Sequence, residues 1–322
     1  MVDLSPDLVA TVAARLAPYV RRTPVLLTEA FGAPMAVKAE HLQHTSSFKF
    51  RGALARLLAL DDAERARGVV TASTGNHGIG VATAGRRLGV PVTVCVAEDT
   101  DRAITGRLER LGASVLRVAS RDCADAEREA RRIGAADGRT FVSPYNDAVV
   151  AAGQGSIAVE LLSQLDELAW PGLDAVVVAV GGGGLVSGIA TWVAHALPGA
   201  RVVGAQPAAD AAMAASVAAG RIIEVAARPT LSHSTAGGIE EGAITFPVCR
   251  DLVADWVRVE EDAIVDAVRR MILEEHQLVE GAAGVALAAG AEFLRREPDA
   301  RVAVISCGAR LTPTELQAVL AA

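Results

Sequence analysis

Short apolar runs rich in valine, isoleucine and alanine alternate along this 322-residue chain with longer stretches of helical periodicity. Several runs contain almost no polar position, which is typical of strands covered by helices on both faces. Their alternation with helices predicts the βαβ units of an open parallel sheet. The predicted strands are Met35–Ala39, Val69–Ala72, Val92–Val96, Ser114–Val118, Ala175–Val180, Arg201–Ala205 and Val302–Ser306. The predicted helices are Gly52–Leu60, Ile79–Leu88, Ala103–Leu111, Asp122–Ile133, Gly155–Leu165, Gly188–His195 and Glu261–Glu275.

The elements divide into two predicted units of an α/β fold. Residues 64–145 hold a close series of short strand–helix units, which predicts a small α/β domain inserted into a larger one. Residues 1–63 and 146–322 would form that larger domain. The turn-rich stretch Ala226–Ile244 has little periodicity, and loops of this size in compact domains are often functional.

Two segments need to be separated from targeting or membrane signals. The uncharged stretch Ala175–Ala200 is long enough to span a bilayer, but a glycine run and three polar side chains interrupt it. We therefore predict a strand, a turn and a helix there. The N-terminus carries Asp3 and Asp7 where a signal peptide would carry Lys or Arg, so we predict a first amphipathic helix and a cytoplasmic protein with no membrane partner.

Composition narrows the function classes further. The net charge is −7, and the arginines are scattered among acids, which disfavours nucleic-acid binding. The four cysteines have no CxxC spacing, so neither a zinc site nor a disulfide framework is expected, and a reducing cytoplasm is the default. The cysteines are Cys95, Cys123, Cys249 and Cys307.

A run of four glycines, Gly181–Gly184, joins an apolar strand to a helix that begins near Leu185. Without Cβ atoms, this backbone can approach a ligand closely, and its N–H groups converge at a helix N-terminus, which favours a phosphate. The run lacks the GxGxxG pattern with a downstream acid and the Lys-Ser/Thr of a P-loop. We therefore predict that the glycine run binds a ligand with a single phosphate group. The alternative is a tight strand–helix turn, which would need only one glycine.

Lys49 lies among hydroxyl and apolar neighbours at a predicted helix start, in Thr45-Ser46-Ser47-Phe48-Lys49-Phe50-Arg51-Gly52-Ala53. Burial lowers the pKa of a lysine and so supplies the free amine that a Schiff base requires. Most lysines are surface residues, but this chain has only Lys38 and Lys49. The other basic side chains are arginines, so a lysine in an apolar setting indicates a reactive amine.

The segment Ser73-Thr74-Gly75-Asn76-His77-Gly78 directly follows the predicted strand Val69–Ala72. Hydroxyls, glycine and a helix start coincide there, so backbone N–H groups and hydroxyls can face an anion such as a substrate carboxylate. A plain helix N-cap by serine or threonine explains the same letters equally well.

Taken together, the three segments resemble the fold-type II pyridoxal 5'-phosphate (PLP) enzymes, in the serine/threonine ammonia-lyase (threonine dehydratase) and serine racemase group. The resemblance runs from Arg22-Thr23-Pro24 to Ser306-Cys307-Gly308, with the motifs in the family's order. It implies a tryptophan synthase β-like fold, with two open α/β sheet domains and the active site between them. It also implies PLP as cofactor, a small amino acid as substrate and a homodimer.

The resemblance also implies roles for the matching positions. Lys49 would hold PLP as a Schiff base and remove the Cα proton. Asn76 would bond the cofactor's 3'-hydroxyl, and Ser306 would bond its pyridine nitrogen. The cofactor-binding set is Phe48, Lys49, Asn76, Gly181, Gly182, Gly183, Gly184, Leu185, Gly238 with its neighbour Gly237, Glu280 and Ser306. The substrate-binding set is Ser73, Thr74, Gly75, Asn76, His77 and Gln154, the last from a Gly-Gln-Gly segment.

The expected reaction is β-elimination of water from L-threonine, L-serine or a related 3-hydroxy amino acid, giving a 2-oxo acid and ammonia. A neutral serine at the pyridine nitrogen makes the cofactor a weaker electron sink and favours elimination over transamination. Racemisation needs an acid/base on the opposite face of Cα, which in the racemases is a serine. Thr74 stands at that position, and its added methyl group restricts χ1, so a racemase is the second hypothesis. A β-replacement synthase and a non-enzymatic phosphate-ligand protein are further alternatives.

Several positions depart from the family pattern. The family's activating cation site has an acid before a proline, where this chain has Gln206, and a later carboxylate position is Ala212, with Asp210 offset. A hard cation prefers several charged oxygen ligands, so we predict a weak or absent divalent site. Ser46 and Cys307 replace glycines and are expected to narrow the pocket or alter substrate choice. The chain ends at Ala322, so no regulatory domain with isoleucine feedback is expected.

Overall fold

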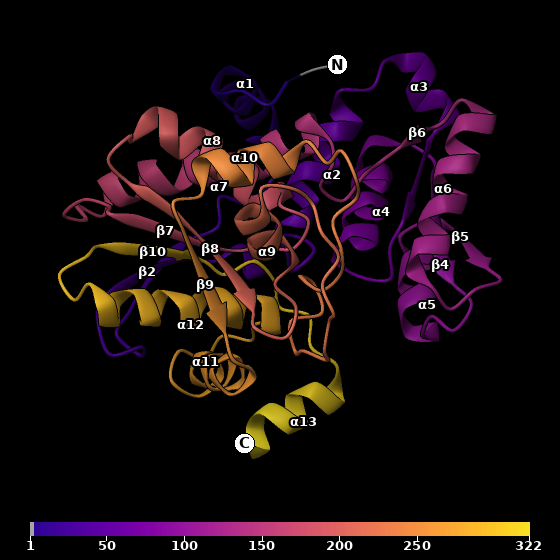
Figure 1. Ribbon diagram of the computed structural model, residues 1–322. Helices are drawn as coiled ribbons and strands as arrows, with labels where there is room; N and C mark the ends of the chain where they lie inside the picture. The colour runs from indigo at the N-terminus through magenta and orange to yellow at the C-terminus, as the bar shows by residue number, and fades with distance from the viewer. Residues whose placement is uncertain (1–2) are drawn as a thin grey trace.

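The computed structural model describes residues 3–322 and contains two open sheets (Figure 1). The larger sheet has six strands in the order β1-β2-β10-β7-β8-β9. All neighbours are parallel except β1, which pairs antiparallel with β2 at one edge. The strands are β1 (Val25–Thr28), β2 (Met35–Lys38), β7 (Ala175–Ala179), β8 (Arg201–Pro207), β9 (Asp255–Val259) and β10 (Val302–Ile305).

The smaller sheet is entirely parallel, with the order β5-β4-β3-β6. Its strands are β3 (Val69–Ala72), β4 (Val92–Ala97), β5 (Ser114–Val118) and β6 (Thr140–Phe141). All four lie between residues 64 and 145, and Figure 1 shows them grouped with α3 to α6 on one side of the molecule. The domain boundary at these two residues remains a prediction.

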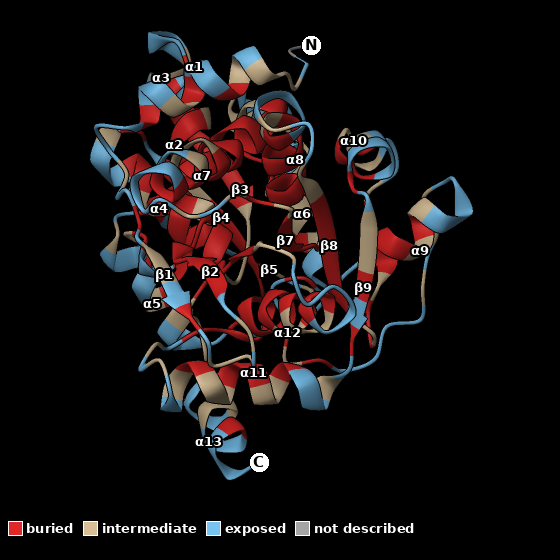
Figure 2. Ribbon diagram, turned by 90° about the vertical axis from the view of Figure 1, so that its left-hand side faces the viewer, coloured by how far each residue is buried: buried red, intermediate tan, exposed pale blue. Residues whose placement is uncertain are grey.

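Helices cover both faces of the large sheet. Helices α7 (Ala148–Glu167) and α8 (Gly184–Ala196) lie on one face, and α12 (Gly281–Arg296) lies on the other with α11 (Glu261–Leu273) packed against it (Figure 1). Figure 2 shows that the central strands and the helices against them are buried almost throughout. The other helices are α1 (Pro6–Leu16), η1 (Glu40–Leu42, 3-10), α2 (Lys49–Leu58), α3 (Asp62–Arg67), α4 (Asn76–Leu88), α5 (Arg102–Arg110), α6 (Cys123–Asp137), α9 (Ala212–Ala219), α10 (Thr245–Leu252) and α13 (Pro313–Ala321).

The predicted parallel α/β architecture is confirmed, and every predicted strand and helix is present, although α7 begins at Ala148 and not at the predicted Gly155. The sequence did not predict several elements: the strands β1, β6 and β9, the 3-10 helix η1, and the helices α3, α9, α10, α12 and α13. Helix α12 explains one cause. It consists largely of alanine, glycine and other apolar residues and is buried on nearly every face, so it lacks the polar stripe that marks an amphipathic helix.

The two apolar segments that resemble membrane spans belong to the core. Residues Ala175–Ala200 form β7, the glycine turn and α8, as predicted. Helix α7 is long and apolar enough to cross a bilayer by length and composition alone, but 72% of its most apolar window is buried inside the protein. Such burial is typical of a core helix in an α/β protein, where neighbouring elements already cover the apolar surface.

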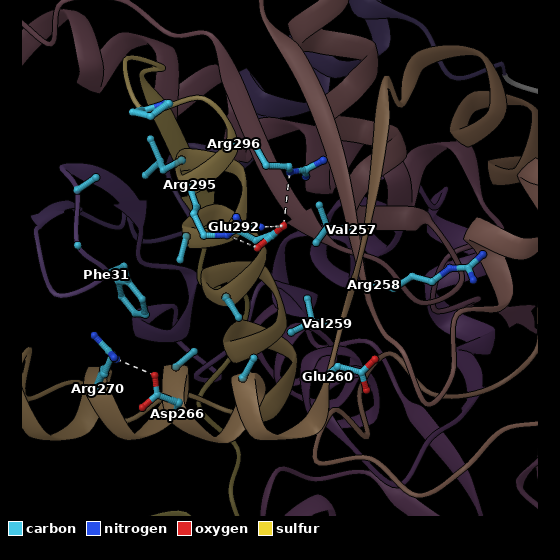
Figure 3. Close-up of a pocket in the computed structure, with 18 of the residues that line it drawn as sticks. Phe31, Val257, Arg258, Val259, Glu260, Asp266, Arg270, Glu292, Arg295 and Arg296 are labelled. Atoms are coloured by element: carbon cyan, nitrogen blue, oxygen red, sulfur yellow. Dashed lines mark hydrogen bonds and ion pairs between the residues drawn. The ribbon is translucent and has the colours of Figure 1, made fainter.

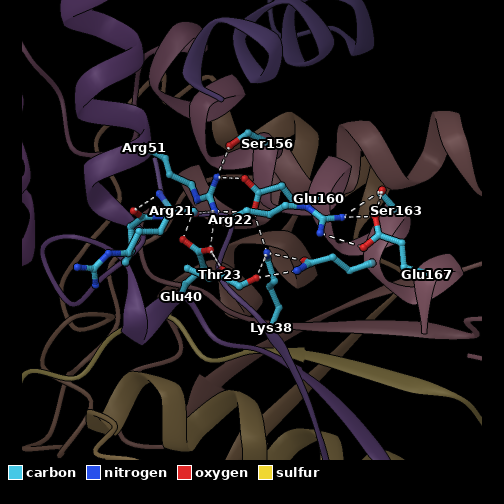
Figure 4. A network of polar contacts seen from close by, with 12 residues as sticks. Arg21, Arg22, Thr23, Lys38, Glu40, Arg51, Ser156, Glu160, Ser163 and Glu167 are labelled. Atoms are coloured by element: carbon cyan, nitrogen blue, oxygen red, sulfur yellow. Dashed lines mark hydrogen bonds and ion pairs between the residues drawn. The ribbon is translucent and has the colours of Figure 1, made fainter. Parts of the chain in front are cut away.

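A network of buried charges joins α2 to the large sheet (Figure 4). The Arg51 guanidinium contacts the Glu40 carboxylate at 2.8 Å and the Glu160 carboxylate at 2.7 Å. Lys38 Nζ donates to Glu160 at 2.8 Å and also to Gln164 and to the Thr23 carbonyl. Because two acids face two bases, the network is neutral as a whole. It ties α2 to β2, to the short helix η1 and to α7.

The direction of the pKa shift at Glu40 shows which effect dominates there. Burial alone would raise the pKa of this fully buried carboxyl, but the positive charge and hydrogen bonds of Arg51 outweigh burial. Lys38 and Thr23 act in the same direction, so the pKa of Glu40 lies below its ordinary value. Glu40 is therefore ionised at neutral pH, and Arg51 depends on it as a counter-ion.

We expect Glu40→Gln to lower the free energy of unfolding by about 3–5 kcal/mol, because it leaves the Arg51 charge buried without a full counter-ion. The matched control is Glu167→Gln, which removes the exposed partner of Arg22 and should cost at most about 1 kcal/mol. Urea unfolding of the two variants and the unmodified protein measures both changes. Equal effects of the two substitutions would show that the network does not stabilise the fold.

Candidate active site

Lys49 is the first residue of α2 and lies deep in a cleft between the two sheets. Its Nζ donates to the Pro144 carbonyl at 2.9 Å and lies 5.1 Å from the centre of the Phe48 ring. Burial lowers the pKa of Lys49 to about 8, although Cys307 and Glu280 oppose the shift. No carboxylate pairs with this amine among residues 3–322, in contrast to Lys38. The amine is therefore substantially uncharged in mildly alkaline solution.

The glycine run forms the wall of a cavity of about 190 Å³ that also contains Lys49. Strand β7 ends at Ala179, and α8 begins at Gly184, so the run is the strand–helix turn that the sequence predicts. Gly183 has φ = +87°, a left-handed conformation that favours glycine. The cavity is lined by Phe48, Lys49, Pro144, Tyr145, Ala179–Val186, Ser234–Gly238, Ala282 and Cys307.

Close packing explains why more than one glycine is present in this turn. A Cβ atom on Gly182 would lie 2.5 Å from the Tyr145 ring, and one on Gly181 would lie 3.0 Å from Thr235 Cα. The first N–H groups of a helix have no partner within the helix, and those of α8 point toward this turn. A cradle of this shape fits a phosphate, with the Lys49 amine in the same cavity. The residues present thus fit PLP.

A second cavity, of about 570 Å³, opens beside the first and shares Lys49, Pro144 and Gly237–Gly238 with it. The segment Ala72–His77, which joins β3 to α4, lines it. Ser73 Oγ accepts a hydrogen bond from Gly75 N at 3.0 Å, which closes the turn before the helix. The residue that precedes α4 is Gly75, and no side chain among residues 3–322 caps this helix, so the alternative of a plain helix N-cap by serine or threonine is wrong. The substrate-binding roles of Ser73, Thr74 and Gly75 remain predictions.

Glu280 connects the two sides of the cleft. It precedes α12 but makes no capping hydrogen bond there, so it is not a simple helix cap. Its buried carboxylate accepts from Asn76 Nδ2 at 2.8 Å and 3.1 Å and from the Arg310 backbone N at 3.0 Å. Since Nδ2 of Asn76 is occupied, the Asn76 side-chain oxygen is the atom left to face a ligand.

Two of the predicted substrate residues are turned elsewhere. The His77 ring donates from Nε2 to the Val142 carbonyl at 3.0 Å, and burial with the nearby Lys49 charge lowers its pKa to about 3. Gln154 lines neither cavity, and its side-chain oxygen accepts from Gly52 N at 3.2 Å. The Gly-Gln-Gly segment packs α7 against α2, since a Cβ on Gly153 would lie 2.7 Å from Gly52 Cα.

Ser306 is buried at the end of β10, and its hydroxyl lies 2.7 Å from Nδ1 of His41. His41 in turn contacts the Gln277 side chain at 3.1 Å. The sequence analysis missed His41 because nothing local connects it with a residue 265 positions away. Ser306 itself lines neither cavity, whereas its neighbour Cys307 lines the glycine cavity. The pyridine contact of Ser306 remains a prediction.

Other sequence expectations fare unevenly. Ser46 has φ = +60° and, like Thr45, lines neither cavity, so a glycine there would relieve backbone strain and not widen the pocket. The irregular loop 226–244 does line the cleft, through His233–Gly238. Tyr145 and Arg310 also line it and were missed. The sequence offered one signal for each residue: Tyr145 lies just before the segment that forms α7, and Arg310 follows the Ser306-Cys307-Gly308 motif.

At the family's cation site, Gln206 stands in place of the acid and makes hydrogen bonds within the protein. Gln206 donates from Nε2 to the Val180 carbonyl at 3.0 Å, and its oxygen accepts from Ala214 N at 2.7 Å. Asp210 accepts from Gly237 N at 2.7 Å. Across residues 3–322, no group of three or more His, Cys, Asp or Glu side chains is placed to hold a metal ion. The weak or absent divalent site remains a prediction.

A larger cavity lies away from this cleft (Figure 3). It has a volume of about 860 Å³ and runs between β9, α11 and α12. Most of its charges neutralise each other: Asp266 pairs with Arg270, and Glu292 pairs with Arg295 (Figure 3). It contains neither Lys49 nor the glycine turn, so we do not assign it to the chemistry.

Comparisons with known proteins agree with this site. Residues 16–308 match the family of pyridoxal-phosphate dependent enzymes, so the chain belongs to that family. An L-threonine ammonia-lyase from Geobacter sulfurreducens is 38% identical, with 85% of this chain and 68% of that protein aligned.

Serine racemases are similar to the chain as well. The serine racemase of Arabidopsis thaliana is 35% identical over 89% of this chain and 86% of its own. The structure of maize serine racemase superposes with a TM-score of 0.90 at 30% identity, covering 99% of this chain and 98% of that one. The fold is thus that of fold-type II PLP enzymes, as predicted.

We expect Gly182→Ala to weaken PLP binding about tenfold, because the added methyl group forces the turn or the Tyr145 ring to shift. Gly199→Ala is the control, since a Cβ atom there meets nothing within 4 Å. Titration of the cofactor-free variants with PLP, followed by visible absorbance, measures the change. Unaltered affinity in Gly182→Ala would argue against the glycine turn as the phosphate site.

Proposed function

We propose that this protein is a PLP-dependent ammonia-lyase that converts L-threonine, L-serine or a related 3-hydroxy amino acid to a 2-oxo acid and ammonia. The observation that carries the proposal is the Lys49 amine, which lies in one cavity with the Gly181–Gly184 turn, has no acid partner among residues 3–322 and has its pKa lowered to about 8. The similarity to threonine ammonia-lyases supports this reaction.

Lys49 has two roles in this proposal. Its amine is the attachment point for the cofactor, which, when bound, withdraws electrons from Cα and so acidifies the Cα hydrogen. The free Lys49 Nζ would accept that proton as the general base. The Pro144 carbonyl, 2.9 Å away, orients the amine. A pKa of about 8 keeps a useful fraction uncharged near neutral pH.

The surrounding residues bind and orient the groups that react. Gly181–Gly184 and Leu185 would hold the cofactor phosphate, Phe48 and Gly238 would pack near its ring, and Asn76, bonded to Glu280, would bind its 3'-hydroxyl. The loop Ser73–His77 holds the substrate carboxylate at the N-terminus of α4. Because the His77 ring is neutral and bonded to Val142, this loop acts through backbone N–H groups and hydroxyls and not through an imidazolium.

An amino acid racemase is the second candidate, favoured by the similarity to serine racemases. Thr74 lines the larger cavity and keeps a hydroxyl that could act on Cα. Its extra methyl group restricts the hydroxyl's rotation, which ranks racemisation second. The homodimer and the cytoplasmic location stay part of the proposal, as does independence from divalent cations.

The pH dependence of cofactor capture tests Lys49 directly. Only the uncharged amine attacks PLP, so the rate of capture should rise with pH and level off above a midpoint near 8, not near 10.5. The rate is followed by the visible band that appears when PLP is added to cofactor-free protein. Lys49→Ala should give no borohydride-stable attachment and no turnover. A midpoint near 10, or full activity in Lys49→Ala, would refute the assignment.

Product analysis separates the two candidate reactions. We expect release of a 2-oxo acid and ammonia from L-threonine and L-serine to exceed formation of D-serine by the same preparation. Thr74→Ser should raise racemisation relative to elimination, because it removes the methyl group that restricts χ1. Racemisation faster than elimination would make the racemase the main activity.

The lyase activity should also survive treatment with EDTA. A large loss of activity with EDTA that Mg²⁺ restores would reveal a divalent site.

A further inference from the structure

Arg310 places a positive charge in the substrate-side cavity, and within residues 3–322 this charge has no acidic partner. It follows β10 by five residues and lines the 570 Å³ cavity together with Lys49, Thr74 and Gly75. Its backbone N donates to Glu280, but among residues 3–322 its guanidinium makes no hydrogen bond or ion pair. The other arginine-rich cavity of the protein is different, because acids neutralise most of its arginines.

The Arg310 guanidinium also lies near the N-terminus of α4, an end of the helix that disfavours a cation. Its Nη1 would be 3.0 Å from a Cβ atom on Gly75, the residue that precedes α4. The N-terminus of this 13-residue helix is its positive end and attracts anions. A guanidinium there is unfavourable by itself, and Lys49 adds a further positive group nearby. An anion between Arg310 and α4 would satisfy both.

Glu280 holds the two halves of this site in register. One carboxylate oxygen pair accepts from Asn76, the first residue of α4, and the same carboxylate accepts from the Arg310 backbone. Glu280 is only 3% exposed, so both contacts are made in a dry environment. The spacing between the helix N-terminus and Arg310 is therefore set by a buried side chain and not by solvent-exposed loops.

We propose that Arg310 and the N-terminus of α4 together bind a carboxylate of the substrate, so that Arg310 is a substrate-binding residue. This inference rests on the proposed function, since it requires an amino acid in the cleft. A guanidinium can bind a carboxylate through two parallel N–H···O bonds, which fixes orientation as well as charge. Ligands without a carboxylate, or with an amide in its place, gain nothing from Arg310 and should bind the protein more weakly than amino acids do.

The carboxylate could be the α-carboxylate that every amino acid has or the side-chain carboxylate of a 3-hydroxy dicarboxylic amino acid. The position of Gly75 favours the α-carboxylate. Arg310 lies against Gly75, the residue directly before α4, so its guanidinium is next to the backbone N–H groups at the start of that helix. Arg310 binds the substrate equally before and during reaction, so its loss should raise KM and leave kcat nearly unchanged.

The experiment compares Arg310→Met and Arg310→Lys with the control Arg258→Met, which removes an exposed arginine outside the cleft. L-alanine has no β-hydroxyl to eliminate, so its dissociation constant can be measured from the change in the visible PLP band. We expect Arg310→Met to raise that constant about ten- to hundredfold, the loss of a charged hydrogen-bond pair. Arg310→Lys should recover part of the affinity, and Arg258→Met should match the unmodified protein. Ethylamine, which lacks a carboxylate, should bind all variants alike.

Two further arms identify the carboxylate and separate the inference from its basis. If L-alanine binds Arg310→Met normally while KM for 3-hydroxyaspartate rises, the side-chain carboxylate is the one bound. If neither changes, the role of Arg310 is overturned, although the lyase proposal still stands when the unmodified protein has its PLP band and turns over L-threonine. An unmodified protein with no PLP band overturns both.

Discussion

The position of Lys49 depends on the buried ion network around Arg51, two residues further along α2. Removing four charged side chains from water is costly, and only their mutual contacts offset that cost. The network therefore tolerates one arrangement of α2 against β2 and α7, the one in which Glu40 and Glu160 face Arg51. The helix that begins at Lys49 is thereby fixed, and the amine points into the cleft and not toward the core.

The two lysines of the chain illustrate how partners decide function. Lys38 is fully buried, yet it donates to Glu160, Gln164 and the Thr23 carbonyl, so its charge is compensated. Among residues 3–322, Lys49 is hydrogen-bonded only to the Pro144 carbonyl, so burial lowers its pKa to about 8 even though Cys307 and Glu280 oppose the shift. The same residue type thus carries a compensated charge in one place and an amine of lowered pKa in the other.

The cleft forms where the carboxyl ends of parallel strands from both sheets meet, the usual place for ligands in open α/β folds. The glycine turn follows β7, the Ser73–His77 loop follows β3, and Cys307 and Arg310 follow β10. Glu280 is the side chain that joins the two sides, through Asn76 on one and the Arg310 backbone on the other. A change in the relative position of the sheets would alter cofactor and substrate contacts together.

The sequence alone determined the alternation of strands and helices, the glycine turn and the family, because these depend on local periodicity and on motifs a few residues long. Tertiary structure decided what distant side chains do. It paired Ser306 with His41, turned His77 to Val142, withdrew Gln154 from the cleft and brought Arg310 to Gly75. Each of these contacts joins segments far apart in the chain, and hydrogen bonding and charge across such distances leave no periodic trace in the sequence.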